Sequence, residues 1–195
     1  MKTVDNNKTA IIILHEIYGV NQFIEGVCSQ YTGKGYHVFC PNMLGRGFFP
    51  YSEAQEAYEF FIEKVGFDYF KEVESFALQL RQTYESVFLL GFSVGATIAW
   101  RCCENGAFDG IICCYGSRIR DYLSLQPSCP ILLLFAEEDK FDVGDVIDQL
   151  AGKNHLELYK FDAKHGFMDS HSKYYNREQK QLAEDYISIF LRKYH

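Results

Sequence analysis

Short apolar runs alternate with segments of helical periodicity along this 195-residue chain. The runs that we expect to form strands are residues 9–15, 36–40, 86–90, 110–115, 131–136 and 156–161. Their apolar residues are consecutive, which is typical of strands that helices cover on both faces. The alternation therefore predicts an α/β fold with a mostly parallel sheet of about six strands and helices on both faces.

The helical patterns occupy the segments between these runs. They cover residues 21–33, 52–84 with a break near Gly66, 94–104, 143–150 and 174–193. Asn21 is the expected N-cap and Gly33 the expected C-cap of the first helix. Because no linker, composition break or internal repeat interrupts the pattern, residues 1–195 are expected to form a single domain.

The charge distribution argues against two classes of partner. The chain has 19 basic and 26 acidic residues, a net charge of −7, and no run of Lys or Arg, so it lacks the basic surface of a nucleic-acid binder. The longest aliphatic stretch, residues 10–14, is too short to cross a bilayer or to form the apolar region of a signal peptide. We therefore expect a cytoplasmic protein with neither a nucleic-acid nor a membrane partner.

The seven cysteines show no spacing typical of a metal site or a disulfide framework. Their number is odd, no CxxC pair occurs, and four of them form two adjacent doublets at positions 102–103 and 113–114. We expect buried, reduced thiols, and neither a metal nor another cofactor.

A G-x-S-x-G motif occupies residues 91–95, which read Gly-Phe-Ser-Val-Gly. It follows an expected strand and precedes a helix of small residues, which is the context of a nucleophile elbow. A plain helix N-cap would explain Ser93 but not the glycines on both sides of it. The motif therefore predicts that Ser93 is a nucleophile, activated by a base elsewhere in the chain.

An acid and a histidine follow the motif in the order that this architecture requires. Asp139 comes just after the strand expected at residues 131–136, and His165 comes after the strand expected at residues 156–161. We therefore predict a Ser93–His165–Asp139 triad. The alternatives are His15 as the base, and Glu137, Glu138 or Asp142 as the acid.

Two backbone amides are expected to form the oxyanion hole. One belongs to Val94, directly after the nucleophile, and the other to Ile17, in the loop that follows the first strand. Only the N–H groups matter at these positions, so the side chains carry no information.

Four segments together resemble the dienelactone hydrolase family. They are residues 15–46, which begin HEIYGVN, the elbow GFSVG, the strand end LLLFAEEDKF and the segment FDAKHGF. The resemblance implies a compact α/β-hydrolase fold with no substantial cap domain. It also implies active-site positions for Glu16, which corresponds to the glutamate that contacts the family's resting nucleophile, and for Tyr115.

The sequence departs from the family pattern at two functional positions. Ser93 stands in place of the usual cysteine nucleophile, so Glu16 is expected to accept a hydrogen bond from the serine rather than to act with a thiolate. Asp169 stands close after His165, where family members that cleave dienelactone have a substrate-binding arginine. An anionic lactone is therefore a poor candidate substrate. We interpret Arg46, at a common family position, as a loop-fixing residue.

Aromatic residues cluster in the segments expected at the carboxyl edge of the sheet, where such folds bind ligands. They are Tyr18, Phe48, Phe49, Tyr51, Phe92, Tyr115, Phe141 and Phe167. These rings predict a pocket for an apolar or aromatic, uncharged group.

The sequence as a whole predicts a serine hydrolase of small carboxylic esters or lactones that works through an acyl-enzyme. The alternatives are a thioesterase or peptidase on the same triad, and a non-catalytic binding protein that retains the fold. The expected partner is the small-molecule substrate, and the oligomeric state is left open.

Overall fold

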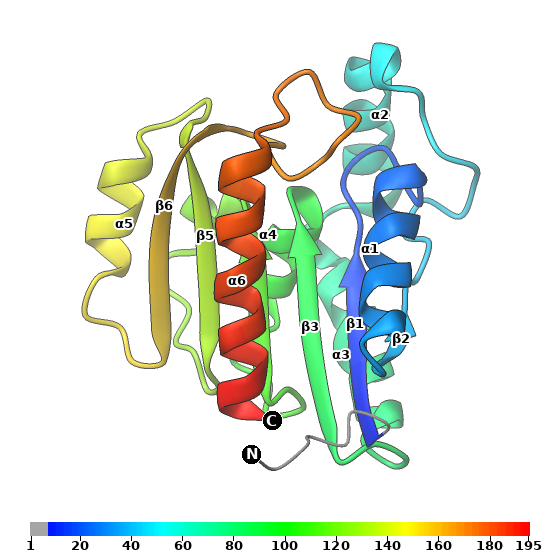
Figure 1. The fold of residues 1–195 in the computed structure, drawn as a ribbon, viewed down its shortest axis with the longest axis vertical. Helices are drawn as coiled ribbons and strands as arrows, with labels where there is room; N and C mark the ends of the chain where they lie inside the picture. The colour runs from blue at the N-terminus through cyan, green and yellow to red at the C-terminus, as the bar shows by residue number, and fades with distance from the viewer. Residues whose placement is uncertain (1–7) are drawn as a thin grey trace.

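Six parallel strands form a single sheet in the computed structural model, which describes residues 8–195 (Figure 1). Their order across the sheet is β2-β1-β3-β4-β5-β6, and every neighbouring pair is parallel. The strands are β1 (Thr9–Leu14), β2 (His37–Phe39), β3 (Ser86–Phe92), β4 (Gly110–Cys114), β5 (Ile131–Glu138) and β6 (Leu156–Lys164). The α/β prediction with about six parallel strands is confirmed.

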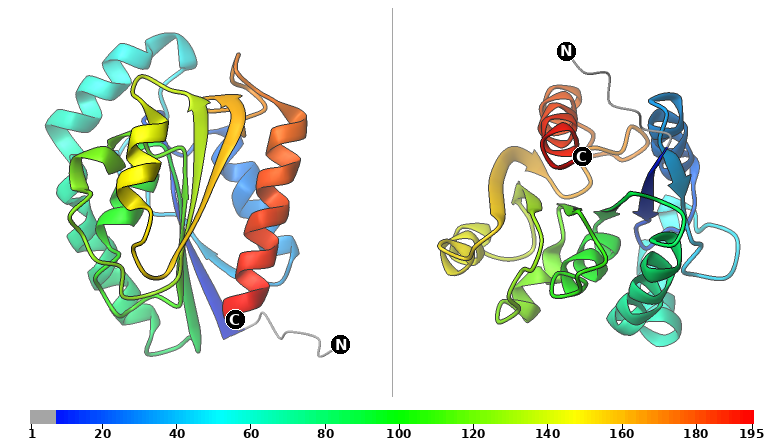
Figure 2. Two further views of the ribbon diagram at one scale, coloured as in Figure 1. Left: turned by 90° about the vertical axis from the view of Figure 1, so that its left-hand side faces the viewer. Right: turned by 90° about the horizontal axis from the view of Figure 1, so that it is seen from below.

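Helices cover both faces of this sheet (Figure 2). The helices are α1 (Gln22–Gly33), α2 (Ala54–Phe60), α3 (Phe70–Leu80), α4 (Val94–Arg101), α5 (Val143–Leu150) and α6 (Arg177–Tyr194). Helices α1 and α6 bury their apolar side chains against one face, whereas α2, α3, α4 and α5 pack on the other. Because the central strands are covered on both sides, β1, β4 and most of β3 are fully buried.

Short helical turns complete the chain between the regular elements. They are η2 (Tyr51–Glu53), the π-helical turn η3 (Phe61–Val65), η4 (Phe67–Tyr69) and η5 (Ser117–Tyr122). The break expected near Gly66 is present, since this glycine has a φ of 67° between η3 and η4. Within residues 8–195, no large cap covers the carboxyl edge of the sheet.

Most element boundaries differ from the sequence prediction by a few residues. Asn21 caps α1 as expected by accepting a hydrogen bond from the Ile24 N–H, but the C-cap is Lys34 rather than Gly33. The left-handed turn that ends this helix falls on Gly35, which has a φ of 89°. Strands β5 and β6 are longer than expected because the two strands remain paired with each other as far as Glu138 and Lys164.

Candidate active site

The turn between β3 and α4 holds Ser93 in a strained backbone conformation, with φ 54° and ψ −113°. A positive φ is sterically unfavourable for any residue other than glycine. It persists at a serine only where the surrounding structure imposes it. A Cβ atom on Gly91 would collide with the backbone of Gly95, and one on Gly95 would lie 2.5 Å from the Leu14 carbonyl oxygen. The two glycines of the motif are therefore required by close backbone contacts.

Adding a methyl group at Gly95 is expected to destabilise the fold, because the helix would have to move away from the end of β1. We expect Gly95→Ala to lower the free energy of unfolding by about 1–3 kcal/mol. Gly26 is a matched control, since it lies in α1 with nothing within 4 Å of an added Cβ. Gly26→Ala should raise stability by about 0.5–1 kcal/mol. Urea denaturation of both variants would show opposite shifts, and equal shifts would contradict the close approach.

The side chains of Ser93, His165 and Asp139 form a continuous hydrogen-bonded chain. Ser93 Oγ lies 2.9 Å from His165 Nε2, and His165 Nδ1 lies 2.7 Å from Asp139 Oδ2. The strand ends explain this proximity, since β3, β5 and β6 terminate directly before the three residues at one edge of the sheet. The three residues that the sequence placed in a triad are thus brought together.

The carboxylate of Asp139 is well held and shielded. Its side chain is only 4% exposed, and its Oδ1 accepts a hydrogen bond of 2.7 Å from the Lys140 N–H. The imidazole of His165 is 32% exposed and so remains open to a substrate. This arrangement suits a histidine base whose tautomer and ring orientation are fixed by the hydrogen bond between its Nδ1 and Asp139.

The alternative acids are engaged elsewhere. Glu137 pairs with Lys160 at 2.9 Å, and Glu138 pairs with Lys164 at 3.1 Å. Asp142 caps α5 by accepting a hydrogen bond from the Asp145 N–H. None of the three carboxylates contacts the imidazole ring of His165, so Asp139 is the acid that the geometry favours.

His15 ties two loops together instead of facing Ser93. Its Nε2 accepts a hydrogen bond from the Met43 N–H at 2.9 Å, and its Nδ1 lies 2.6 Å from the Glu16 carbonyl oxygen. The ring is fully buried, and burial lowers the pKa of His15 to about 4, so the ring is neutral and donates through Nδ1. Both nitrogens are occupied by main-chain groups, which leaves His15 unsuited to act as the base.

The hydrogen bonds of His15 to the Glu16 carbonyl oxygen and the Met43 N–H orient the loop that carries Ile17. The Ile17 N–H donates to no described residue, and the Val94 N–H, as the first of α4, has no intrahelical acceptor. Two free amides at these positions are what an oxyanion hole requires. The sequence indicated His15 only as an alternative base. Its role in positioning the Ile17 loop depends on its contact with Met43, 28 residues away along the chain, which no local pattern shows.

Glu16 is buried next to the base. The residue is 5% exposed, and its carboxyl group lies beside the Tyr115 hydroxyl and makes no hydrogen bond with Ser93. Burial raises the pKa of Glu16 to about 7, the charge of His165 lowers it, and the charge of Asp169 raises it. The hydrogen bond expected between Ser93 and Glu16 is therefore absent in this structure, where Ser93 contacts His165.

Tyr115 lies behind the imidazole in a left-handed conformation with φ 44°. Its ring packs edge-on against His165, at 5.1 Å between centroids, and against Phe167 at 5.6 Å. The hydroxyl group is fully buried and makes no hydrogen bond of standard geometry among the described residues. Burial raises the pKa of the Tyr115 hydroxyl, and the negative charge of the nearby Glu16 raises this pKa further.

A hydrogen-bonded network that the sequence did not reveal links three loops beside the triad. Asn21 Nδ2 donates to the Tyr51 hydroxyl at 2.9 Å, and that hydroxyl donates to Asp169 Oδ2 at 2.5 Å. Asp169 Oδ1 also accepts from the His171 N–H at 2.8 Å. Because these partners lie 30 and 118 residues apart, no local spacing could have indicated the network.

The structure corrects part of the aromatic pocket expected at the carboxyl edge of the sheet. Phe92 belongs to β3 rather than to a loop, and Phe92 and Phe167 are 1% and 0% exposed because they pack in the core under α1 and α6. Phe49 is likewise buried, at 1% exposed. Tyr18 and Tyr51 remain partly exposed, with ring centroids 4.6 Å apart.

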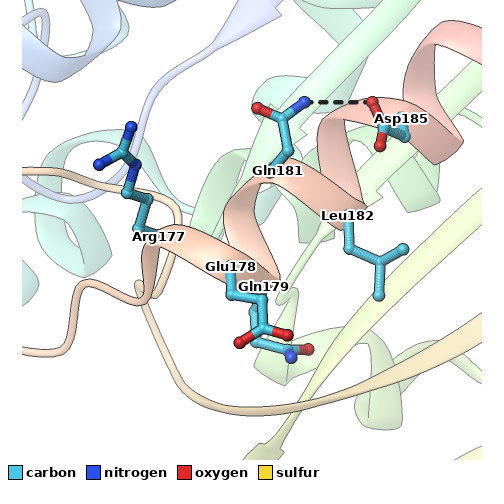
Figure 3. A pocket seen from close by; sticks show the side chains of 6 residues that line it. All are labelled: Arg177, Glu178, Gln179, Gln181, Leu182 and Asp185. Atoms are coloured by element: carbon cyan, nitrogen blue, oxygen red, sulfur yellow. Dashed lines mark hydrogen bonds between the residues drawn. The ribbon is translucent and has the colours of Figure 1, made fainter.

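Two cavities of the structure lie away from Ser93. The larger, about 600 Å³, lies on the surface of α6 and is lined by Arg177, Glu178, Gln179, Gln181, Leu182 and Asp185 (Figure 3). The smaller, about 310 Å³, lies between η5 and α5, where the Arg120 guanidinium stacks 4.8 Å from the ring centroid of Phe141. Neither cavity includes a residue of the triad.

No group of three or more His, Cys, Asp or Glu side chains among residues 8–195 could hold a metal ion. No helix in the same range combines the length and the apolar character needed to cross a membrane.

The burial of Glu16 has a measurable effect on stability. Because the folded chain raises the pKa from 4.5 to about 7, the folded state binds the proton more tightly than the unfolded state. The free energy of unfolding should therefore fall by about 3 kcal/mol as pH rises from about 4.5 to about 7, and Glu16→Gln should escape this loss. Denaturation should show that wild type and variant are equally stable at about pH 4.5 and that the variant is more stable at about pH 8.

His15 has the opposite effect on the pH dependence of stability, so the Glu16→Gln variant is needed to isolate the contribution of Glu16. Its pKa falls from 6.5 to about 4 on folding, so its contribution to stability is lost as pH falls through this window. In the wild type, Glu16 makes the free energy of unfolding fall with rising pH, whereas His15 makes it rise. Only the difference between wild type and Glu16→Gln gives the contribution of Glu16 alone. Exposed Glu56 provides the control substitution Glu56→Gln. A Glu16→Gln variant with the same stability as wild type at about pH 8 would contradict the raised pKa of Glu16.

Comparison with known proteins places this chain in a family. The model of the dienelactone hydrolase family matches residues 1–195. The uncharacterized protein YczH of Bacillus subtilis is 42% identical over 179 residues, covering 87% of this chain and 86% of YczH.

Solved structures share the fold. A Klebsiella pneumoniae subsp. pneumoniae protein proposed to be a dienelactone hydrolase has a TM-score of 0.81 at 17% identity, covering 99% of this chain and 90% of that chain. The dienelactone hydrolase-like promiscuous phosphotriesterase P91, from metagenomic libraries, has a TM-score of 0.75 at 12% identity, covering 97% and 87%. Since the family model spans the whole sequence, this chain belongs to the dienelactone hydrolase family.

Proposed function

We propose that this protein is a serine hydrolase that cleaves small carboxylic esters or lactones through an acyl-enzyme. Membership in the dienelactone hydrolase family makes it a hydrolase of ester bonds. The observation that carries the finer proposal is the continuous chain from Ser93 Oγ through His165 to Asp139, at 2.9 and 2.7 Å.

In the proposed mechanism, His165 Nε2 removes the proton from Ser93 Oγ as the oxygen attacks the ester carbonyl. The carbonyl oxygen becomes an oxyanion and accepts hydrogen bonds from the N–H groups of Ile17 and Val94. Each such donor contributes about 3 kcal/mol to stabilising the transition state in related enzymes. The imidazolium of His165 then gives its proton to the departing alcohol, or to the alkoxide of an opened lactone.

Hydrolysis of the acyl-enzyme repeats these steps with water as the nucleophile. His165 removes a proton from the water, which attacks the acyl carbonyl, and the proton returns to Ser93 Oγ as the acid leaves. Asp139 holds the imidazole in the tautomer with Nδ1 protonated and stabilises the imidazolium. No step in this scheme uses a metal or an organic cofactor.

A panel of p-nitrophenyl esters of increasing acyl length, with a matched thioester and a matched anilide, tests the proposed function. We expect the short-chain esters to have the highest kcat/KM and the anilide to be the poorest substrate. Faster turnover of the thioester, after correction for its chemical reactivity, would favour a thioesterase. Turnover of none of them, together with no labelling by a fluorophosphonate probe, would favour a binding protein that retains the fold.

A further inference from the structure

Two loops that must cooperate in the proposed reaction follow strands that are not neighbours in the sheet. The loop after β1, residues 15–21, carries the Ile17 amide, and the loop after β6, residues 165–176, carries His165. The order β2-β1-β3-β4-β5-β6 places β3, β4 and β5 between these two strands. The loop after β6, in orange, reaches across the carboxyl edge of the sheet (Figure 1). Strand pairing therefore does not set the distance between the two loops directly.

A chain of three polar side chains joins these loops. Asn21, at the end of the first loop, donates from Nδ2 to the Tyr51 hydroxyl at 2.9 Å, and this hydroxyl donates to Asp169 Oδ2 at 2.5 Å. Asp169 belongs to the second loop, where it lies four residues after His165. Burial, and then the hydrogen bond to Asp169, raise the pKa of Tyr51, so its hydroxyl keeps the proton that it donates.

Each end of this chain is fixed within its own loop. Asn21 is 4% exposed, and its Oδ1 accepts a hydrogen bond of 3.2 Å from the Ile24 N–H at the start of α1. Asp169 is 1% exposed; its N–H donates to the Gly166 carbonyl oxygen at 3.1 Å, and its Oδ1 accepts from the His171 N–H at 2.8 Å. Because both carboxylate oxygens of Asp169 already have partners, this side chain is suited to holding the loop rather than to binding a ligand.

We propose that Tyr51 and Asp169 are positioning residues, which hold the His165 loop at the distance from the Ile17 amide that ester hydrolysis needs. The base and the oxyanion hole must act on the same carbonyl group, and a displacement of about 1 Å can lower the rate by about 100-fold. Tyr51 and Asp169 have no hydrogen bond to Ser93 or His165 among residues 8–195, so they act through the loops. The inference rests on the proposed ester hydrolysis and adds two residues on which its rate depends.

The variant Tyr51→Phe removes only the bridging hydroxyl group, from a side chain that is 36% exposed. We expect kcat for the best ester of the panel to fall by about 10- to 100-fold, and KM to stay within about threefold of wild type. Misplaced loops weaken contacts made in the transition state more than they weaken binding of the ester. Tyr84→Phe is the matched control, because its hydroxyl lies 2.8 Å from His37 Nδ1 at the opposite edge of the sheet. This control should keep the wild-type kcat.

Two further comparisons distinguish a continuous chain from separate structural effects. Asn21→Ser keeps a side chain that caps α1 but loses the donor to Tyr51, so its kcat should also fall. The double variant with Tyr51→Phe should lose no more activity than Tyr51→Phe alone, because both changes break the same chain. Asp169→Asn can still bond both to Tyr51 and to its own loop, and should keep about 10-fold more activity than Asp169→Ala. Losses that multiply in the double variant would overturn the positioning role.

Nuclear magnetic resonance of the histidine rings separates this inference from the proposed function, because it needs no substrate. The protein is labelled with ¹⁵N-histidine, and the ring signals of His165 are assigned from their loss in His165→Gln. We expect these signals to move in Tyr51→Phe and to stay in place in Tyr84→Phe, where the signals of His37 move instead. Such a result supports the positioning role even if the wild type hydrolyses no ester. Unmoved His165 signals with an unchanged kcat in Tyr51→Phe overturn the positioning role and leave the esterase in place.

Discussion

Replacing Ser93 by alanine is expected to lower kcat for the best ester of the panel by about 10⁶-fold. The reason is that the acyl-enzyme cannot form without the Oγ atom that lies 2.9 Å from His165 Nε2. The measurement is steady-state kinetics combined with labelling by a fluorophosphonate probe and intact-mass analysis. Wild type should gain one adduct and Ser93→Ala none.

A second serine gives the control for this experiment. Ser29 is exposed on α1, where its hydroxyl donates only to the Glu25 carbonyl oxygen. Ser29→Ala should therefore keep full activity and full labelling. Equal labelling of wild type and Ser93→Ala would show that another residue is the nucleophile.

Replacing Asp139 by asparagine is expected to lower kcat by about 10⁴-fold, with little change in overall structure. The amide group at this position can donate to His165 Nδ1, and the imidazole would then carry its proton on Nε2. In that tautomer the ring cannot accept the proton of Ser93 Oγ. Steady-state kinetics for the best ester, with circular dichroism to confirm folding, measures the effect.

Asp142→Asn is the control for this second prediction. Asparagine caps helices about as well as aspartate, so α5 should be preserved. If Asp142→Asn lowers kcat by several orders of magnitude while Asp139→Asn does not, the acid of the triad is misassigned. The 2.7 Å hydrogen bond between His165 Nδ1 and Asp139 Oδ2 predicts the opposite result, a large loss in Asp139→Asn and none in Asp142→Asn.

The serine nucleophile changes what the buried glutamate can do. A serine hydroxyl is far less acidic than a thiol, so its proton must go to a base at the moment of attack, and His165 is in place to take it. Glu16 stays off the serine in this structure and lies in the electrostatic field of His165 and Asp169. No hydrogen bond joins Glu16 to Ser93 in this structure, so the contact that can activate the serine is the one with His165.

Local pattern and chain order predicted much of this protein. The alternation of apolar runs and helical segments determined the parallel sheet, because crossover helices bury both faces of such strands. The elbow at residues 91–95 and the strands expected to end at residues 136 and 161 predicted where Ser93, Asp139 and His165 lie. Parallel strands carry the residues that follow them to the same edge, so a linear order becomes a cluster.

Burial and long-range partners had to come from the tertiary structure. The sequence alone could not show that His15 clamps Met43, that Tyr51 joins Asn21 to Asp169, or that Phe167 lies in the core. These contacts join loops whose paths depend on how the helices pack, and no local periodicity encodes them. The raised pKa of Glu16 has the same origin, since desolvation is set by the atoms that surround a carboxyl group rather than by its place in the chain.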